Sequence, residues 1–145
     1  MDLVRLGAGR WDVLVAEPVI EVLSDFSSAK GPKKAMLSFL RESVPMHGPQ
    51  EGNRTVCKQL KPGSLKLSEF RKGQYPGTKI RVIWFYGDEA TKLQIVCVRA
   101  FPKNDEETPA SEIPAAMKLR EQYLDARDRG SLKIEELPSF SGGFS

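Results

Sequence analysis

The sequence predicts an α+β fold with one compact domain in the element order β-α-α-β-β-β-α. Strand-forming residues, alternating or in continuous runs, predict strands at 10–17, 54–71, 78–86 and 93–101. Apolar residues at helical spacing predict helices at 17–28, at 29–43 and between Ser111 and Gly130. Short turns rich in Gly join the last three strands, which indicates an antiparallel meander.

The first strand and the two helices after it form the predicted amino-terminal half. Trp11, Val13 and Val15 share one side of the strand because side chains alternate along it. Pro18 suits the first turn of the first helix, and Pro45 is expected to end the second. We expect both helices to pack on one face of the sheet, which leaves the opposite face to carry cationic side chains.

The carboxyl-terminal half begins with segment 54–71, which is expected as an extended strand broken near Pro62. Segment 78–86 is apolar on both faces, as a central strand is. In the last helix Ser111 is the expected N-cap and Gly130 the expected stop. The expected divisions are an N-terminal extension at 1–9, the domain at 10–130 and a C-terminal tail at 131–145.

Positive charge is concentrated in one part of the chain. The formal net charge is +3, yet residues 54–81 contain eight Lys and Arg against one acid, Glu69. Such a local excess indicates a polyanionic partner more strongly than the overall charge does. The composition leaves open, at even weight, a solvated basic hairpin without a ligand.

Glu69, Arg71 and Arg81 form the predicted centre of this basic region. Glu69 and Arg71 share one face of their strand, about 7 Å apart along it, and Arg81 on the next strand can complete the group. Cleavage of RNA by its own 2′-hydroxyl needs a proton acceptor, cations that neutralise the phosphorane, and a proton for the leaving 5′-oxygen. Arg suits the second role because its forked donors reach two phosphate oxygens. The interpretation requires this face to be open to water.

The roles within the predicted site are partly open. Glu69 acts either as a base or as an anchor that orients the arginines, and Lys103 contacts either phosphate or the leaving oxygen. Arg99 contacts RNA or pairs with Glu112. The further predicted RNA-binding residues are Lys66, Lys72 and Lys79.

Three short motifs resemble the RelE/ParE toxin superfamily, and in particular its HigB-like, phage-derived branch. They are "LSEFR", with Leu67, Glu69, Phe70 and Arg71; "KIRVIWFY", with Ile80, Arg81 and Val82; and "VRAFPKNDEETPASEI", with Phe101, Lys103 and 109–113. The resemblance covers about residues 10–127 and is strongest over 65–120. It departs from the RelE branch where two strand lysines are replaced by Leu67 and Glu69, and where no late tyrosine corresponds.

The resemblance implies a RelE-like fold and the toxin of a type II toxin–antitoxin pair. Such toxins are mRNA endoribonucleases that act on the ribosome and inhibit translation, and the implied partner is a helix-turn-helix antitoxin. Two other functions remain open. One is a ParE-like toxin that poisons a protein such as DNA gyrase, and the other is a binding module of this fold without catalysis.

The remaining features exclude several classes. No run of 18 apolar residues occurs, and the first residues lack the pattern of a signal peptide, so we expect a cytoplasmic protein without a membrane partner. Cys57 and Cys97 stand apart and are expected to be reduced and buried. The lone His47 is expected in an exposed loop. No motif for a metal or a small-molecule cofactor is present, and none is expected.

Overall fold

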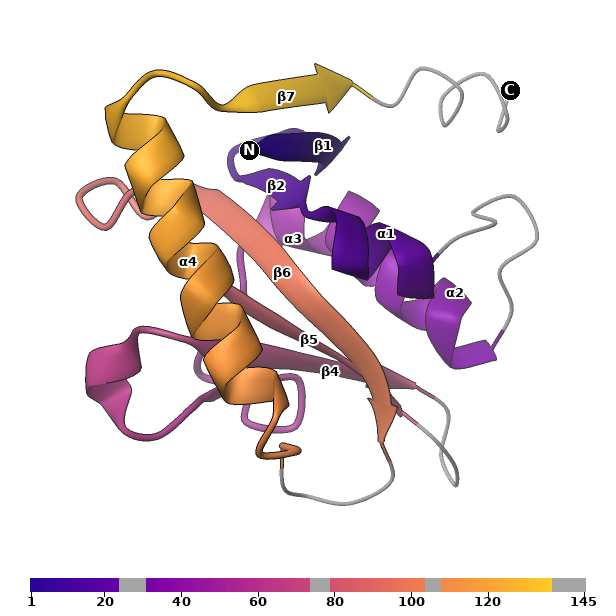
Figure 1. The fold of residues 1–145 in the computed structure, drawn as a ribbon. Coiled ribbons are helices and arrows are strands. Elements are labelled where there is room, and N and C mark those ends of the chain that lie inside the picture. Colours follow the sequence, from indigo (N-terminus) through magenta and orange to yellow (C-terminus); the bar gives the residue numbers. More distant parts are fainter. Residues whose placement is uncertain (24–30, 74–78, 104–107, 137–145) are drawn as a thin grey trace.

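The computed structural model describes residues 1–23, 31–73, 79–103 and 108–136. Within these ranges a seven-stranded sheet carries helices on both faces (Figure 1), so the predicted mixed α+β class is confirmed. The strands are β1 (Asp2–Gly7), β2 (Asp12–Val15), β3 (Cys57–Gln59), β4 (Ser68–Gly73), β5 (Lys79–Tyr86), β6 (Gln94–Lys103) and β7 (Lys133–Glu136). Their order across the sheet is β3-β4-β5-β6-β2-β1-β7.

The centre of the sheet is the predicted meander. β4 pairs antiparallel with β5, and β5 pairs antiparallel with β6. β2 then lies parallel to β6, with Val13 opposite Ile95. A parallel neighbour needs a long crossover, and the helices between β2 and β3 are part of the chain that makes it.

The early helices cover one face of the sheet, as predicted. They are α1 (Glu17–Val22), α2 (Gly31–Ser38), a π-helical turn (Phe39–Ser43) and α3 (Val44–His47). Their apolar stripes meet the even-numbered side chains of β4 and β5 in one buried cluster, where Met36 and Leu40 join Phe70, Val82 and Trp84. The ring of Phe70 stacks on Trp84 with centroids 4.8 Å apart.

The expectation that Pro45 ends the second helix is wrong. The helical path continues for another turn, to His47. The π-helical turn places Pro45 in the first turn of α3, where its missing N–H needs no partner. Gly48 ends the helix at a φ of 81°, and a Cβ there would lie 2.9 Å from the ring of Trp11.

The last helix, α4 (Glu112–Asp128), lies on the opposite face and crosses the meander (Figure 1). Ala116 and Tyr123 pack there against a second buried cluster that includes Ile83 and Phe85 of β5. The predicted limits are confirmed, since Ser111 is the N-cap and the chain turns at Gly130 with a φ of 68°.

The segment 54–71 is not one strand broken at Pro62. It folds back, so that β3 pairs antiparallel with β4 and Cys57 lies opposite Phe70. The reversal follows from Pro62 and the 3₁₀ turn Gly63–Leu65, which cannot continue a ladder.

Both ends of the described chain also enter the sheet. β1 pairs antiparallel with β2, and β7 pairs in parallel with β1 at the edge (Figure 1). Neither strand is among those predicted from the sequence. Part of the first predicted helix and most of the turn after β4 lie at 24–30 and 74–78, outside the described residues.

Candidate nucleic-acid interface

The alternation of β4 and β5 places Glu69, Arg71 and Arg81 on the face that α4 occupies. Phe70 and Val82, the neighbours of these residues, point into the opposite cluster. Arg71 lies directly opposite Arg81 in the pairing of the two strands, and Glu69 lies opposite Ile83. The three-residue group predicted from the spacing is therefore present.

Glu69 is the counterion of both arginines. Its Oε1 accepts a hydrogen bond from Nε of Arg71 at 2.9 Å and lies 3.5 Å from Nη1 of Arg81. Its Oε2 accepts a hydrogen bond from the hydroxyl of Thr108, in the segment before α4. Both carboxylate oxygens are thus engaged, which favours the orienting role for Glu69 over the role of a base.

The expectation that this face is solvated is wrong for the arginine group. Glu69 is 0% exposed, Arg81 2% and Arg71 7%. Burial of two guanidinium groups costs several kcal/mol unless a carboxylate lies among them, and Glu69 supplies it. The spacing of these residues predicts that their side chains share one face of the sheet. It does not predict their burial, because this depends on contacts with residues elsewhere in the chain, such as Thr108.

Lys79 and Lys103 lie beside this group. They are partners in the pairing of β5 with β6, two positions beyond the pair Arg81 and Phe101 and on the same face. Both side chains are half-buried. The structure thus gathers Arg71, Arg81, Lys79 and Lys103 at one end of the meander.

Arg99 and Glu112 form an ion pair between β6 and α4. Nε and Nη2 of Arg99 donate to the two carboxylate oxygens at 2.7 and 3.1 Å. This hydrogen bonding raises the pKa of Arg99. Of the two roles left open for Arg99, the structure shows the pairing with Glu112.

Lys66 and Lys72 lie apart from the arginine group. Lys66 is exposed after the 3₁₀ turn, with a φ of 58°. Lys72 points to the other face, where its ammonium lies 4.9 Å from the ring centroid of Phe39. It lines a smaller cavity of about 470 Å³ there with His47, which is exposed as expected but ends α3 rather than lying in a loop.

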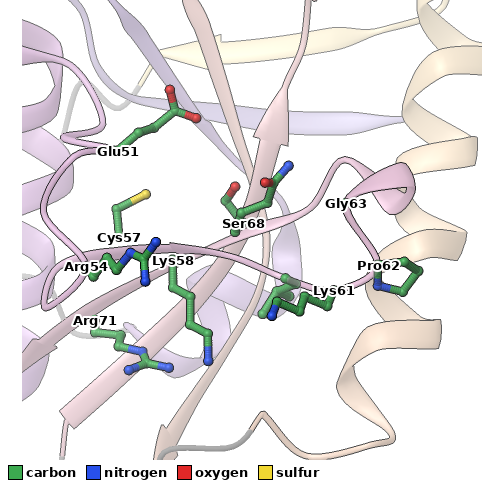
Figure 2. Close-up of a pocket in the computed structure, with 11 residues that line it drawn as sticks. Glu51, Arg54, Cys57, Lys58, Lys61, Pro62, Gly63, Ser68 and Arg71 are labelled. Atoms are coloured by element: carbon green, nitrogen blue, oxygen red, sulfur yellow. The ribbon is translucent and has the colours of Figure 1, made fainter.

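A cavity of about 1230 Å³ opens beside β3 and reaches Arg71. Figure 2 shows Arg54, Lys58 and Lys61 around it, with the head groups of Lys58 and Arg71 below the backbone of β3. Lys58 lies opposite Glu69 in the pairing of β3 with β4, which sets it on the same face. These three cations belong to the basic segment 54–81, but their spacing in the sequence does not indicate a site.

The other side of this cavity is lined by Glu51 and Cys57, and the carboxylate of Glu51 points away from the cations (Figure 2). Burial, and secondarily Glu51, raises the pKa of Cys57 to about 12 and also raises that of Tyr86. Burial raises the pKa of Cys97 as well. Both cysteines are buried and reduced, as expected.

The cavity and the arginine group present positive charge without metal ligands. Among the described residues no cluster of three His, Cys, Asp or Glu could hold a metal ion. Within the same ranges no helix combines the length and apolar character needed to cross a membrane. An arrangement of this kind can bind and polarise a phosphate group by electrostatics and hydrogen bonding.

Comparison with family models, with curated proteins and with solved structures gives no match for this chain.

Proposed function

We propose that the chain is the toxin of a type II toxin–antitoxin system, an endoribonuclease that cleaves mRNA on the ribosome and inhibits translation. The motifs between residues 65 and 120 suggest this class and its RelE-like fold. The observation that carries the proposal is the gathering of Arg71, Arg81, Lys79 and Lys103 on one face, at one end of the meander. Cations on neighbouring strands can stabilise the negative charge that develops on a phosphodiester during cleavage.

The proposed reaction needs no metal. The 2′-oxygen of a ribose attacks the adjacent phosphorus and gives its proton to a base, while the bond from phosphorus to the 5′-oxygen breaks. The leaving oxygen takes a proton, and the products carry a 2′,3′-cyclic phosphate and a 5′-hydroxyl. Arginine side chains stabilise the phosphorane because they stay protonated throughout.

Burial divides the roles within the site. Arg71 lines the cavity, so in this proposal it contacts the phosphate. Arg81 is almost fully buried against Glu69 and acts through it. Glu69 and Arg81 are therefore positioning residues that hold Arg71, and Lys103 at the end of β6 is the candidate for contact with the leaving oxygen.

The proposed partners follow from the same class. A cognate antitoxin with a helix-turn-helix would neutralise the toxin, and mRNA on the ribosome would be its substrate. No small-molecule cofactor enters the reaction, because proton transfer and electrostatic stabilisation suffice for it.

A second candidate function is favoured by the burial of the Glu69 group. A site whose carboxylate has both oxygens engaged offers no evident base. A ParE-like toxin that acts on a protein such as DNA gyrase, or a binding module without catalysis, would need none. The two classes of toxin are expected to have different effects when they are expressed in cells.

Inducible expression in bacteria tests the proposal. We expect growth arrest with a fall in incorporation of labelled methionine and no induction of the SOS response. Arg71→Gln should relieve the arrest and keep its fold, because Glu69 retains Arg81. Lys33→Gln, an exposed charge on α2, is the matched control and should remain toxic.

Two outcomes would contradict the nuclease. SOS induction with intact translation would support the gyrase target instead. Growth at the rate of an empty vector, with the folded protein present in the cells, would support the binding module.

A further inference from the structure

The cavity beside β3 holds positive charge that no ion pair between described residues neutralises. Arg54, Lys58 and Lys61 are exposed and line it, and none of them forms an ion pair with another described residue. On the same face, by contrast, Arg99 has Glu112 and the buried arginines have Glu69. Part of the excess positive charge of this face thus lies at the cavity.

These cations come from three different parts of one hairpin. Arg54 lies in the turn before β3, Lys58 lies within β3, and Lys61 begins the turn toward Gly63–Leu65. The antiparallel return of the chain brings them to the same hollow as Arg71 of β4 (Figure 2). Like charges held around a hollow repel each other at a modest cost in water, and a multivalent anion removes that cost.

We propose that this cavity is a phosphate-binding site in which Arg54, Lys58 and Lys61 contact the phosphate oxygens. Phosphate fits better than a carboxylate because it offers more acceptor oxygens and more charge to several donors at once. Lys58 lies on the same face as Arg71, whereas Gln59 and Ser68 line the other side of the cavity with Cys57.

Arg71 joins this cavity to the Glu69 group, so a phosphate held here lies next to the proposed reaction site. The ligand is therefore a phosphate that flanks the cleaved one on the same RNA strand. This choice of source rests on the proposed function, whereas the cavity and its charges do not. A free nucleotide would offer the same phosphate chemistry.

The test compares two triple variants of the full chain. Arg54→Gln, Lys58→Gln and Lys61→Gln together remove the cations of the cavity. Lys33→Gln, Lys34→Gln and Lys133→Gln together remove three exposed charges from α2 and from β7 at the opposite edge of the sheet. Both variants lose the same net charge, so a general electrostatic effect weakens them equally.

Three probes are titrated against each protein at several salt concentrations. They are a six-nucleotide RNA with deoxyribose at its cleavable positions, adenosine 5′-diphosphate, and inorganic pyrophosphate. We expect the cavity variant to bind the RNA at least about tenfold more weakly than the control variant. Its plot of log affinity against log salt should be less steep by about 0.7 for each phosphate that the variant no longer binds.

The probes separate the two sources of phosphate. Tighter binding of RNA than of either small probe assigns the site to the RNA strand. Equally tight binding of the diphosphate, abolished in the cavity variant alone, keeps the phosphate site but overturns RNA as its source. Equal affinities of the cavity and control variants for every probe overturn the site itself.

The test also distinguishes this site from the proposed function. Binding that depends on the cavity, without cleavage of mRNA by the unchanged protein, would overturn the function and leave the site. Cleavage together with equal RNA binding by both variants would leave the function and overturn the site.

Discussion

Arg71 lies directly opposite Arg81 in the antiparallel pairing of β4 with β5, and both side chains are buried. Like charges at such a position destabilise a sheet. The carboxylate of Glu69, two residues before Arg71 on the same face, contacts both guanidinium groups and makes the arrangement stable. The carboxylate of Glu69 therefore stabilises this end of the meander.

Replacement of Glu69 by Gln should lower the free energy of unfolding by about 3–5 kcal/mol, because it removes a counterion that both buried guanidinium groups contact. Urea denaturation measures the change. Glu112→Gln is the control, since it breaks a partly exposed pair with Arg99 and should cost about 1 kcal/mol. Equal losses in the two variants would show that Glu69 does not have the role given to it here.

The hydroxyl of Thr108 should contribute to the same group through its hydrogen bond to Glu69. We expect Thr108→Val to cost about 1.5–3 kcal/mol, the range for a hydrogen bond to a charged group. Thr108→Ser keeps the hydroxyl and should retain most of that stability. A serine variant as unstable as the valine variant would show that methyl packing, and not the hydrogen bond, is what Thr108 provides.

The buried thiols predict how stability depends on alkaline pH. The pKa of Cys57 is raised by burial from its ordinary value of 9.0 to about 12, and that of Cys97 is raised as well. Above pH 9 the unfolded chain loses these protons before the folded chain does, so the free energy of unfolding should decrease as pH rises from 9 toward 12. The stabilisation is fully present below pH 9.

Alkylation by iodoacetamide at pH 8 gives a second readout of the same burial. Both cysteines should react in urea and neither in the native protein, because the thiolate is the reactive form and the thiols are buried. The variant Cys97→Ser should lose half of the labelling that is seen in urea, which assigns the remaining label to Cys57. Rapid labelling of the native protein would contradict the burial of the thiols.

The meander and both helical layers could be predicted because each signal is local. The apolar run of β5, the turn at Gly87, and the limits of the last helix at Ser111 and Gly130 all follow from neighbouring residues. The short strands β1 and β7 were not predicted, and β7 pairs with β1 from the other end of the described chain. The partner of β7 lies too far away in the sequence for a local pattern to indicate it, whereas β1 also pairs with β2, which follows it closely.

The candidate site was predictable in the same measure. The alternation of side chains along a strand predicted that Glu69, Arg71 and Arg81 share one face. The burial of this group depends on tertiary contacts such as that of Thr108. The sequence pattern does not indicate the cavity, because it predicts an extended strand with a break near Pro62 and does not show that the chain folds back at the break. Only the return of β3 onto β4 brings Lys58 opposite Glu69.

The most direct test of the central claim is a cell-free translation reaction with the purified protein, in which the 5′ ends of the mRNA are mapped by primer extension. We predict new 5′-hydroxyl ends at sites in phase with the codons, which appear only when ribosomes translate the message and which Arg71→Gln abolishes. Intact mRNA in the presence of folded protein, at concentrations that arrest the growth of cells, would contradict the assignment as a ribonuclease.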